Sequence, residues 1–191
     1  METRHSGYDA WAVRWRVPLG FVLSLAYLVL AQPTLRLLAV GSGVAFVGLL
    51  LRAWAAGYLE KGSTLATSGP YAFTRNPLYL GSALIGVGFA VAGRSAVMVA
   101  AFIVLLVVVY WPVMLREERF LSQKFGAAYE GYAARVPLFL PRIRPLTASA
   151  EGFRWQRYRK NREYEAALGW AAGVGLLALK MILRGAWAGF L

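Results

Sequence analysis

Five long apolar runs constrain this sequence more than any other feature. The fourth run has 21 residues without a charge, which is enough for a helix to cross a hydrocarbon core of about 30 Å. Hydrophobic residues make up 59% of the chain, against about 45–50% in soluble domains. The sequence therefore predicts an all-α integral membrane protein and excludes a soluble globular enzyme, a disordered tail and a fibrous repeat. The runs are 17–31, 37–59, 78–92, 95–115 and 166–183.

The distribution of basic residues predicts how these runs are oriented. With a cytosolic N-terminus, the inner segments 1–16, 60–77 and 116–165 hold 16 of the 21 Lys and Arg residues, Arg4 and Lys61 among them. Cytosolic loops carry such an excess, so we expect the N-terminus on the cytosolic side. A net charge of +12 is typical here of loops held against anionic lipid. We expect membrane lipid as a partner and no nucleic acid.

The chain offers a restricted set of reactive groups. It has no Cys and a single His, His5. Disulfides, thiolate zinc sites and Cys nucleophiles are thereby excluded, and we expect no metal site, since one remote His cannot complete a ligand set. Chemistry must come from carboxylates, Arg, Lys, Tyr, Ser, Thr and Asn.

Local signals place the turns and helix ends. Asn76-Pro77 is a typical helix start, with Asn as N-cap and Pro in the first turn, and this structural role alone explains the pair. Gly93-Arg94 predicts a tight turn that makes the third and fourth runs a helical hairpin. The fourth helix should continue to Phe125-Gly126, where Gly ends it. A short helix over 127–135 follows, and then a rigid non-helical stretch, 136–141, with a Pro near each end.

Two adjacent acids follow the fourth run. Glu117 and Glu118 lie between Arg116 and Arg119, so surface ion pairs explain them. A catalytic or cofactor-binding role is the alternative.

Two blocks in a fixed order resemble the isoprenylcysteine carboxyl methyltransferase and phospholipid methyltransferase superfamily. The first, from Gly69 to Gly81, is similar to the family pattern G-P-Y-x-x-x-R-H-P-x-Y-x-G. The second begins at Glu117-Glu118, ends at Pro141, and is similar to E-E-x-x-L-x-x-x-F-G-x-x-Y-x-x-Y-x-x-x-V-P. It includes Leu121, Phe125-Gly126, Tyr129, Tyr132 and Val136-Pro137.

The resemblance implies a methyltransferase that uses S-adenosyl-L-methionine, with its site at the cytosolic face. It assigns catalysis to Arg75, Glu117 and Glu118. A carboxylate meets the cofactor's amino group, Arg75 or the helix start meets its carboxylate, and tyrosines cover the adenine or the sulfonium. The acceptor would be a lipophilic small molecule methylated on O, N or S. The implied cofactor-binding residues are Gly69, Pro70, Tyr71, Arg75, Asn76, Pro77, Tyr79, Leu80, Gly81, Glu117 and Glu118.

Two positions depart from the family pattern. Asn76 stands where the family has His, and an amide neither carries charge nor titrates. Val113 stands where the prenylcysteine enzymes have an Arg five residues before the second acid, which argues against a carboxylate acceptor and slightly favours an amine. Arg52 and Arg116 are the alternatives for that missing Arg.

Other interpretations remain open for the chain as a whole. Residues 153–162 interleave aromatic and basic side chains, which is typical of an interfacial anchor and compatible with binding a substrate headgroup. We expect residues 1–191 to form a single membrane-embedded methyltransferase domain. The alternatives are a membrane reductase of the steroid-reductase kind using NADPH, and a non-catalytic lipid-binding scaffold.

Overall fold

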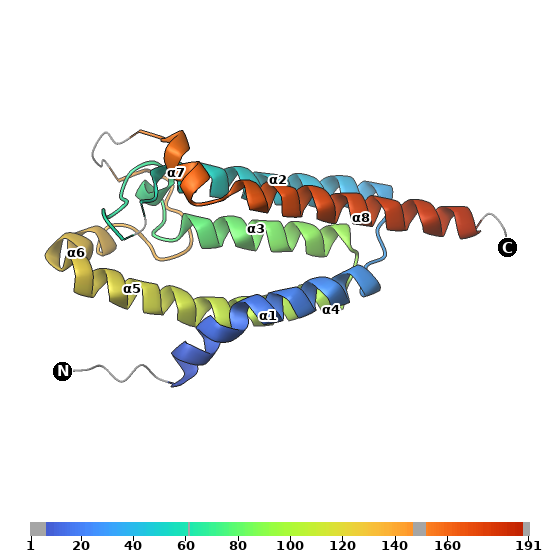
Figure 1. Cartoon of the computed structure of the whole chain (residues 1–191), viewed down its shortest axis with the longest axis horizontal. Helices are drawn as coiled ribbons and strands as arrows, with labels where there is room; N and C mark the ends of the chain where they lie inside the picture. Colours follow the sequence, from blue (N-terminus) through green and yellow to red (C-terminus); the bar gives the residue numbers. More distant parts are fainter. Residues whose placement is uncertain (1–6, 61, 147–151, 189–191) are drawn as a thin grey trace. The chain divides into compact units, whose positions relative to one another are not determined.

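A computed structural model describes residues 7–60, 62–146 and 152–188, and these residues form helices and connections without strands (Figure 1). The predicted all-α class is confirmed. Arg4, His5 and Lys61 lie outside the described residues. The elements in chain order are α1 (Gly7–Leu30), α2 (Leu35–Tyr58), the 3-10 helix η1 (Gly69–Ala72), α3 (Pro77–Ala92), α4 (Ala96–Leu105), the π-helical η2 (Leu106–Tyr110), α5 (Trp111–Phe125), α6 (Ala127–Ala133), α7 (Trp155–Lys160) and α8 (Tyr164–Ala188).

Each predicted apolar run coincides with a helix. Three helical stretches are long and apolar enough to cross a membrane: Leu35–Tyr58, Ala96–Phe125 and Tyr164–Gly185. Two apolar helices, Val17–Leu30 and Pro77–Ala92, are shorter. An integral membrane protein follows from these helices, and five spans remain a prediction that is compatible with them.

The predicted turn between the third and fourth runs is present. The Gly93 amide donates to the Phe89 carbonyl at 2.9 Å and the Arg94 amide to the Val91 carbonyl at 3.1 Å. Glycine is required because a Cβ at position 93 would lie 2.4 Å from the Tyr27 ring. Ser95 then caps α4 by accepting a hydrogen bond from the Met98 amide. The helical hairpin is therefore fixed by local capping and by one close contact.

The described chain divides into two compact units, which we treat separately. The apolar unit contains residues 1–43, 86–118 and 173–191, and the motif unit contains residues 44–85 and 119–172. Helices α2, α3, α5 and α8 contribute residues to both. The expectation of a single domain stays a prediction.

The apolar unit is packed through small residues. Ala31, Leu38, Ala92 and Leu177 form its buried cluster. A Cβ at Gly41 would lie 2.4 Å from the Gly88 carbonyl oxygen, so glycine allows α2 and α3 to approach closely, as is typical of membrane helices.

A charged side chain completes the apolar unit. Lys180 donates from Nζ to the carbonyls of Leu28 and Val29 near the end of α1, at 2.5 and 2.8 Å. The ammonium group thereby binds two carbonyls at the helix C-terminus, where a positive charge is favourable.

The motif unit combines a similar helix contact with a core at its polar end. A Cβ at Gly48 would lie 2.5 Å from the Gly81 carbonyl oxygen, which holds α2 and α3 together here as well. Tyr129, Tyr132 and Val136 form the second buried cluster, and the partly buried Leu65, Leu121, Phe125, Ala133 and Leu146 pack around it. This cluster supports the loop that carries the first sequence block.

Candidate functional site

The first sequence block forms a tight turn before α3. Gly69 has φ +58°, and a Cβ there would lie 2.7 Å from the Tyr58 ring. The Tyr71 amide donates to the Ser68 carbonyl at 3.2 Å, and the Phe73 amide to the Pro70 carbonyl at 3.1 Å. Gly69 and Pro70 of the motif therefore build the 3-10 turn η1 itself.

The second sequence block supplies a short helix and an extended segment. Gly126, at φ +51°, separates α5 from α6, as the sequence predicts. Tyr129 and Tyr132 lie on the same face of α6, because residues three apart are neighbours on a helix. Their rings meet edge to face with centroids 6.2 Å apart. Residues 136–146 then leave the helix, which confirms the prediction for 136–141.

Backbone hydrogen bonds join the two blocks. The Arg75 amide donates to the Pro137 carbonyl, the Arg142 amide to the Phe73 carbonyl and the Leu146 amide to the Ala72 carbonyl, each at 2.9 Å. Within the motif unit, the structure therefore brings residues 72–75 and 137–146 side by side.

Two side chains complete this junction. Thr74, which is 2% exposed, donates from Oγ1 to the Phe139 carbonyl at 2.9 Å and accepts from the Asn76 amide at 3.3 Å. Asn76 donates from Nδ2 to the Leu138 carbonyl at 3.0 Å. The carbonyl of Asn76 also accepts the first helical bond of α3, from the Leu80 amide. Asn76 thus begins α3 and ties the helix start to the extended segment.

Arg75 faces the tyrosine pair. Its Nη1 donates to the Tyr129 hydroxyl at 3.3 Å. Tyr132 donates from its hydroxyl to the Tyr71 carbonyl at 2.8 Å. Burial raises the pKa of the Tyr132 hydroxyl, and the nearby Tyr129 raises it further, while Arg75 opposes both. Tyr132 therefore stays a neutral donor, and the guanidinium of Arg75 is positioned beside two phenols.

The predicted site residues of the first block divide into two groups. Pro70, Tyr71, Pro77 and Gly81 are buried, and Tyr71 is only 6% exposed, so its ring belongs to the core. The half-buried residues are Gly69, Arg75, Asn76, Tyr79 and Leu80. The half-buried polar side chains of the block are therefore Arg75, Asn76 and Tyr79.

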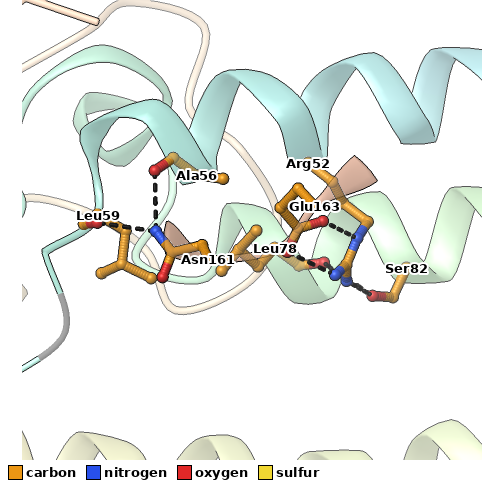
Figure 2. Close-up of polar contacts among 7 residues, drawn as sticks. All are labelled: Arg52, Ala56, Leu59, Leu78, Ser82, Asn161 and Glu163. Atoms are coloured by element: carbon orange, nitrogen blue, oxygen red, sulfur yellow. Dashed lines mark hydrogen bonds and ion pairs between the residues drawn. The ribbon is translucent and has the colours of Figure 1, made fainter. Parts of the chain in front are cut away.

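An ion pair that the sequence reasoning missed lies one turn further along α3 (Figure 2). Arg52 of α2 binds Glu163 through two bonds, Nε to Oε2 at 3.0 Å and Nη2 to Oε1 at 2.8 Å. Its Nη1 donates to Ser82 Oγ at 2.5 Å and to the Leu78 carbonyl at 3.4 Å. An Arg inside an apolar run indicates such a partner, but no local feature of the sequence singles out Glu163.

The segment before α8 is attached to the C-terminal end of α2. Asn161 donates from Nδ2 to the carbonyls of Ala56 and Leu59 at 3.0 and 2.9 Å (Figure 2). Arg157, whose side chain is 8% exposed, pairs with Glu60 at 2.9 Å. These polar contacts satisfy carbonyls that a helix end leaves open.

The predicted acid pair lies in the other unit. Glu117 and Glu118 are on α5, at the end of the apolar unit. In the motif unit, three of the four acids in the described residues are held by ion pairs. These pairs are Glu60 with Arg157, Glu163 with Arg52 and Glu165 with Arg162.

Metal-ligating side chains do not gather in the part of the chain that the structure describes. Over residues 7–60, 62–146 and 152–188, no three His, Asp or Glu residues lie close enough to hold a metal ion.

Comparison with known proteins finds a similar family. Residues 37–128 match the family model described as phospholipid methyltransferase. This match confirms the predicted resemblance to the isoprenylcysteine and phospholipid methyltransferase superfamily over residues 37–128. No solved structure matches the chain significantly.

Two curated relatives carry names from metal resistance. The chain is 34% identical over 139 residues to the cobalt-zinc-cadmium resistance protein CzcN of Cupriavidus metallidurans, covering 72% of this chain and 56% of that protein. It is 32% identical over 111 residues to the nickel-cobalt-cadmium resistance protein NccN of Alcaligenes xylosoxydans xylosoxydans, covering 56% and 51%. The chain therefore spans about half the length of the curated relatives it matches.

Proposed function

We propose that this protein is a membrane methyltransferase that uses S-adenosyl-L-methionine to methylate a lipophilic acceptor. The observation that carries the proposal is the junction of the two motif blocks in the motif unit, where residues 72–76 bind residues 137–146. The family match over residues 37–128 supports the same class of reaction. It favours a methyltransferase over an NADPH-dependent reductase and over a non-catalytic scaffold.

The cofactor's carboxylate suits the Arg75 end of the motif unit. Arg75 is a half-buried guanidinium beside the start of the 16-residue helix α3. A guanidinium forms charge-assisted hydrogen bonds with carboxylates, and a helix N-terminus favours an anion. We assign Arg75 and Asn76 to this end of the cofactor, with Tyr79 of the following turn beside them.

The cofactor's amino group needs a carboxylate, and α5 offers one. The ion pairs of Glu60, Glu163 and Glu165 occupy most of the acids described in the motif unit. The resemblance of the second block to the family pattern supports Glu117, with its neighbour Glu118, as the counter-charge.

The demands on the protein are mainly positional. The bound cofactor supplies an electrophilic methyl group, and transfer is an in-line displacement at carbon, so orientation dominates. Arg75 and Asn76 orient one end of the cofactor, and Glu117 and Glu118 the other. Residues 137–146 are held against the first block by backbone hydrogen bonds.

The acceptor is lipophilic and is methylated on O, N or S. Arg52 is engaged by Glu163, Ser82 and Leu78, so it does not supply the substrate clamp that is absent at Val113. Arg116 stays the candidate for that role. Without such a clamp an amine acceptor is favoured over a carboxylic acid, because it needs less orientation.

The site faces the cytosol in this proposal. The basic asymmetry of the sequence supports a cytosolic N-terminus and an external turn at residues 93–94. Single cysteines at Arg94 and Gln156, both exposed, test this in a chain without native Cys. Gly93 is unsuitable because a Cβ there meets Tyr27. A label that reaches position 94 from the cytosolic side alone contradicts the orientation.

The names of the relatives bear on the biological setting. CzcN and NccN are named for resistance to metals. We propose that this chain also contributes to metal resistance, by methylating a lipophilic molecule.

The decisive experiment is cofactor-specific stabilisation of the detergent-purified protein. A ligand that binds the folded state stabilises it by mass action, so S-adenosylhomocysteine should raise the unfolding temperature and NADPH should not. Stabilisation by NADPH favours the reductase, and stabilisation by neither favours the scaffold.

Variants locate the site. By calorimetry, Glu118→Gln should lose about 1.5–3 kcal/mol of cofactor binding, the scale of a hydrogen bond to a charged group. Glu130→Gln, at an exposed acid of α6, is the matched control and should bind normally. Unchanged affinity in both Glu117→Gln and Glu118→Gln removes the acid pair from the site.

Lipid extraction after incubation with methyl-labelled cofactor identifies the acceptor class. Label in the organic phase supports a lipophilic acceptor. Label confined to water-soluble molecules contradicts a lipophilic acceptor. Label in a base-labile ester would show that the acceptor is a carboxylic acid.

A further inference from the structure

A cavity of about 480 Å³ opens beside the C-terminal end of α2, within the motif unit. Four basic side chains line it, Arg154, Arg157, Lys160 and Arg162, together with one carboxylate, Glu60. Its volume lies in the range of ligand sites, about 300–1,000 Å³. The cavity lies outside both motif blocks, and its α7 wall lies beyond the segment that matches the family, 37–128.

The floor of the cavity is fixed by polar contacts. Arg157 pairs with Glu60 at 2.9 Å and donates to the Tyr58 carbonyl at 3.4 Å. Asn161 binds the carbonyls of Ala56 and Leu59. Arg157 therefore neutralises Glu60, and these contacts give the cavity a defined shape.

The rim of the cavity carries an excess of positive charge. Arg162 forms an exposed ion pair with Glu165, so its charge is compensated. Arg154 and Lys160 are exposed on either end of α7, and they provide the net charge that an anion would meet.

The cavity lies at the boundary of the apolar helices. The candidate span Leu35–Tyr58 ends one residue before Leu59 on the cavity wall, and the candidate span Tyr164–Gly185 begins directly after Glu163. Phe153, Trp155 and Tyr158 stack edge to face along this segment, with centroids 5.4 and 5.2 Å apart. Trp155 is 68% exposed. Aromatic side chains of this kind gather at the lipid headgroups.

We propose that this cavity binds the phosphate group of a membrane phospholipid. Arg154 and Lys160 supply charge-assisted hydrogen bonds to the phosphate oxygens, while Arg157 and Asn161 hold the floor. The position of the cavity favours a lipid phosphate over free phosphate. The ends of two apolar helices and the row of aromatic side chains place the cavity at the depth of the phospholipid phosphates. The site is separate from the proposed methyl transfer, and either can fail while the other holds.

The test measures lipid binding to the full chain in detergent by native mass spectrometry. Phosphatidylglycerol is the probe, diacylglycerol with the same chains is the phosphate-free control, and inorganic phosphate is the competitor. We expect saturable binding of phosphatidylglycerol that is weakened about tenfold by Arg154→Gln with Lys160→Gln. Arg159→Gln with Arg144→Gln removes the same charge from exposed positions of the same unit that do not line the cavity, and should change binding less than about twofold.

Three results would overturn the proposal. The first is equal binding in the two double variants, and the second is diacylglycerol bound as tightly as phosphatidylglycerol. The third is inorganic phosphate competing as strongly as the lipid, which assigns the cavity to free phosphate. The double variant Arg154→Lys with Lys160→Arg keeps both positive charges and should bind phosphatidylglycerol as the wild-type protein does. This control separates loss of charge from local unfolding.

Discussion

The apolar unit and the motif unit share four helices and a close glycine contact between α2 and α3, but they differ in their other contacts. In the apolar unit, Gly41, Gly93 and Ala92 let helices and rings approach closely. In the motif unit, backbone hydrogen bonds join residues 72–75 to 137–146, and Arg52 binds Glu163. Lipid tails are as apolar as Leu, so membrane helices associate through close packing and hydrogen bonds. The comparison shows that a loop with a defined shape needs directional polar contacts, whereas a hairpin of helices needs small residues.

Removing the Arg52 charge should have the largest effect on the motif unit. Arg52→Met leaves Glu163, 8% exposed, without its counter-charge, and breaking a buried pair from one side costs about 3–5 kcal/mol. The free energy of unfolding in a denaturing detergent titration measures this loss. Arg52→Met with Glu163→Leu removes both charges and should recover most of the stability. A double variant as unstable as the single one would show that packing around Arg52 matters more than its charge.

Adding one methyl group to α2 compares the two units directly. Gly48→Ala places a Cβ 2.5 Å from the Gly81 carbonyl in the motif unit, and Gly41→Ala places one 2.4 Å from the Gly88 carbonyl in the apolar unit. Backbone cannot move aside cheaply, so each should lose up to about 3 kcal/mol of unfolding free energy. Gly43→Ala meets nothing within 4 Å and should be neutral or stabilising by up to about 1 kcal/mol. Equal effects at positions 41 and 43 would contradict the close contact.

Thr74 tests the polar junction of the motif unit. Thr74→Val keeps the shape and removes the hydroxyl that binds the Phe139 carbonyl and the Asn76 amide. Two half-buried partners each lose a hydrogen bond, so we expect the free energy of unfolding to fall by about 2 kcal/mol. Faster proteolysis of residues 137–146 should accompany it. Thr74→Ser keeps the hydroxyl and should lose less unfolding free energy than Thr74→Val. A larger loss in Thr74→Ser would assign the effect to the methyl group of Thr74.

Local signals predicted the helices and turns of this protein well. The turn at Gly93-Arg94 and the end of α5 at Phe125-Gly126 depend on residues next to each other in the sequence. The first motif block also folds as a unit, because Gly69 and Pro70 determine the turn before α3. The family resemblance, carried by two blocks in a fixed order, is confirmed for residues 37–128.

Contacts between residues far apart in the chain could not be predicted from the sequence. Arg52 and Glu163 are 111 residues apart, and nothing local distinguishes Glu163 from the other acids. Tyr71 was expected to cover a ligand, whereas its ring is buried, because side-chain direction depends on packing by residues elsewhere in the chain. The roles of Glu117 and Glu118 stay predictions.

Tyr132 offers the smallest and most specific test of the junction. Tyr132→Phe removes the bond from its hydroxyl to the Tyr71 carbonyl, 2.8 Å long, and should lose about 1 kcal/mol of unfolding free energy at neutral pH. Burial raises the pKa of this hydroxyl in the folded protein, while in the unfolded chain it is about 10. The contribution of the Tyr132 hydroxyl to the free energy of unfolding is therefore fully present below pH 10. It is lost as the pH rises above that value, because the hydroxyl then loses its proton more readily in the unfolded state than in the folded state. The difference in stability between the two proteins, measured by unfolding from pH 8 to pH 11, should narrow above pH 10. A difference that stays constant over this range would show that Tyr132 ionises as easily in the folded state as in the unfolded one, and would contradict the buried contact with Tyr71.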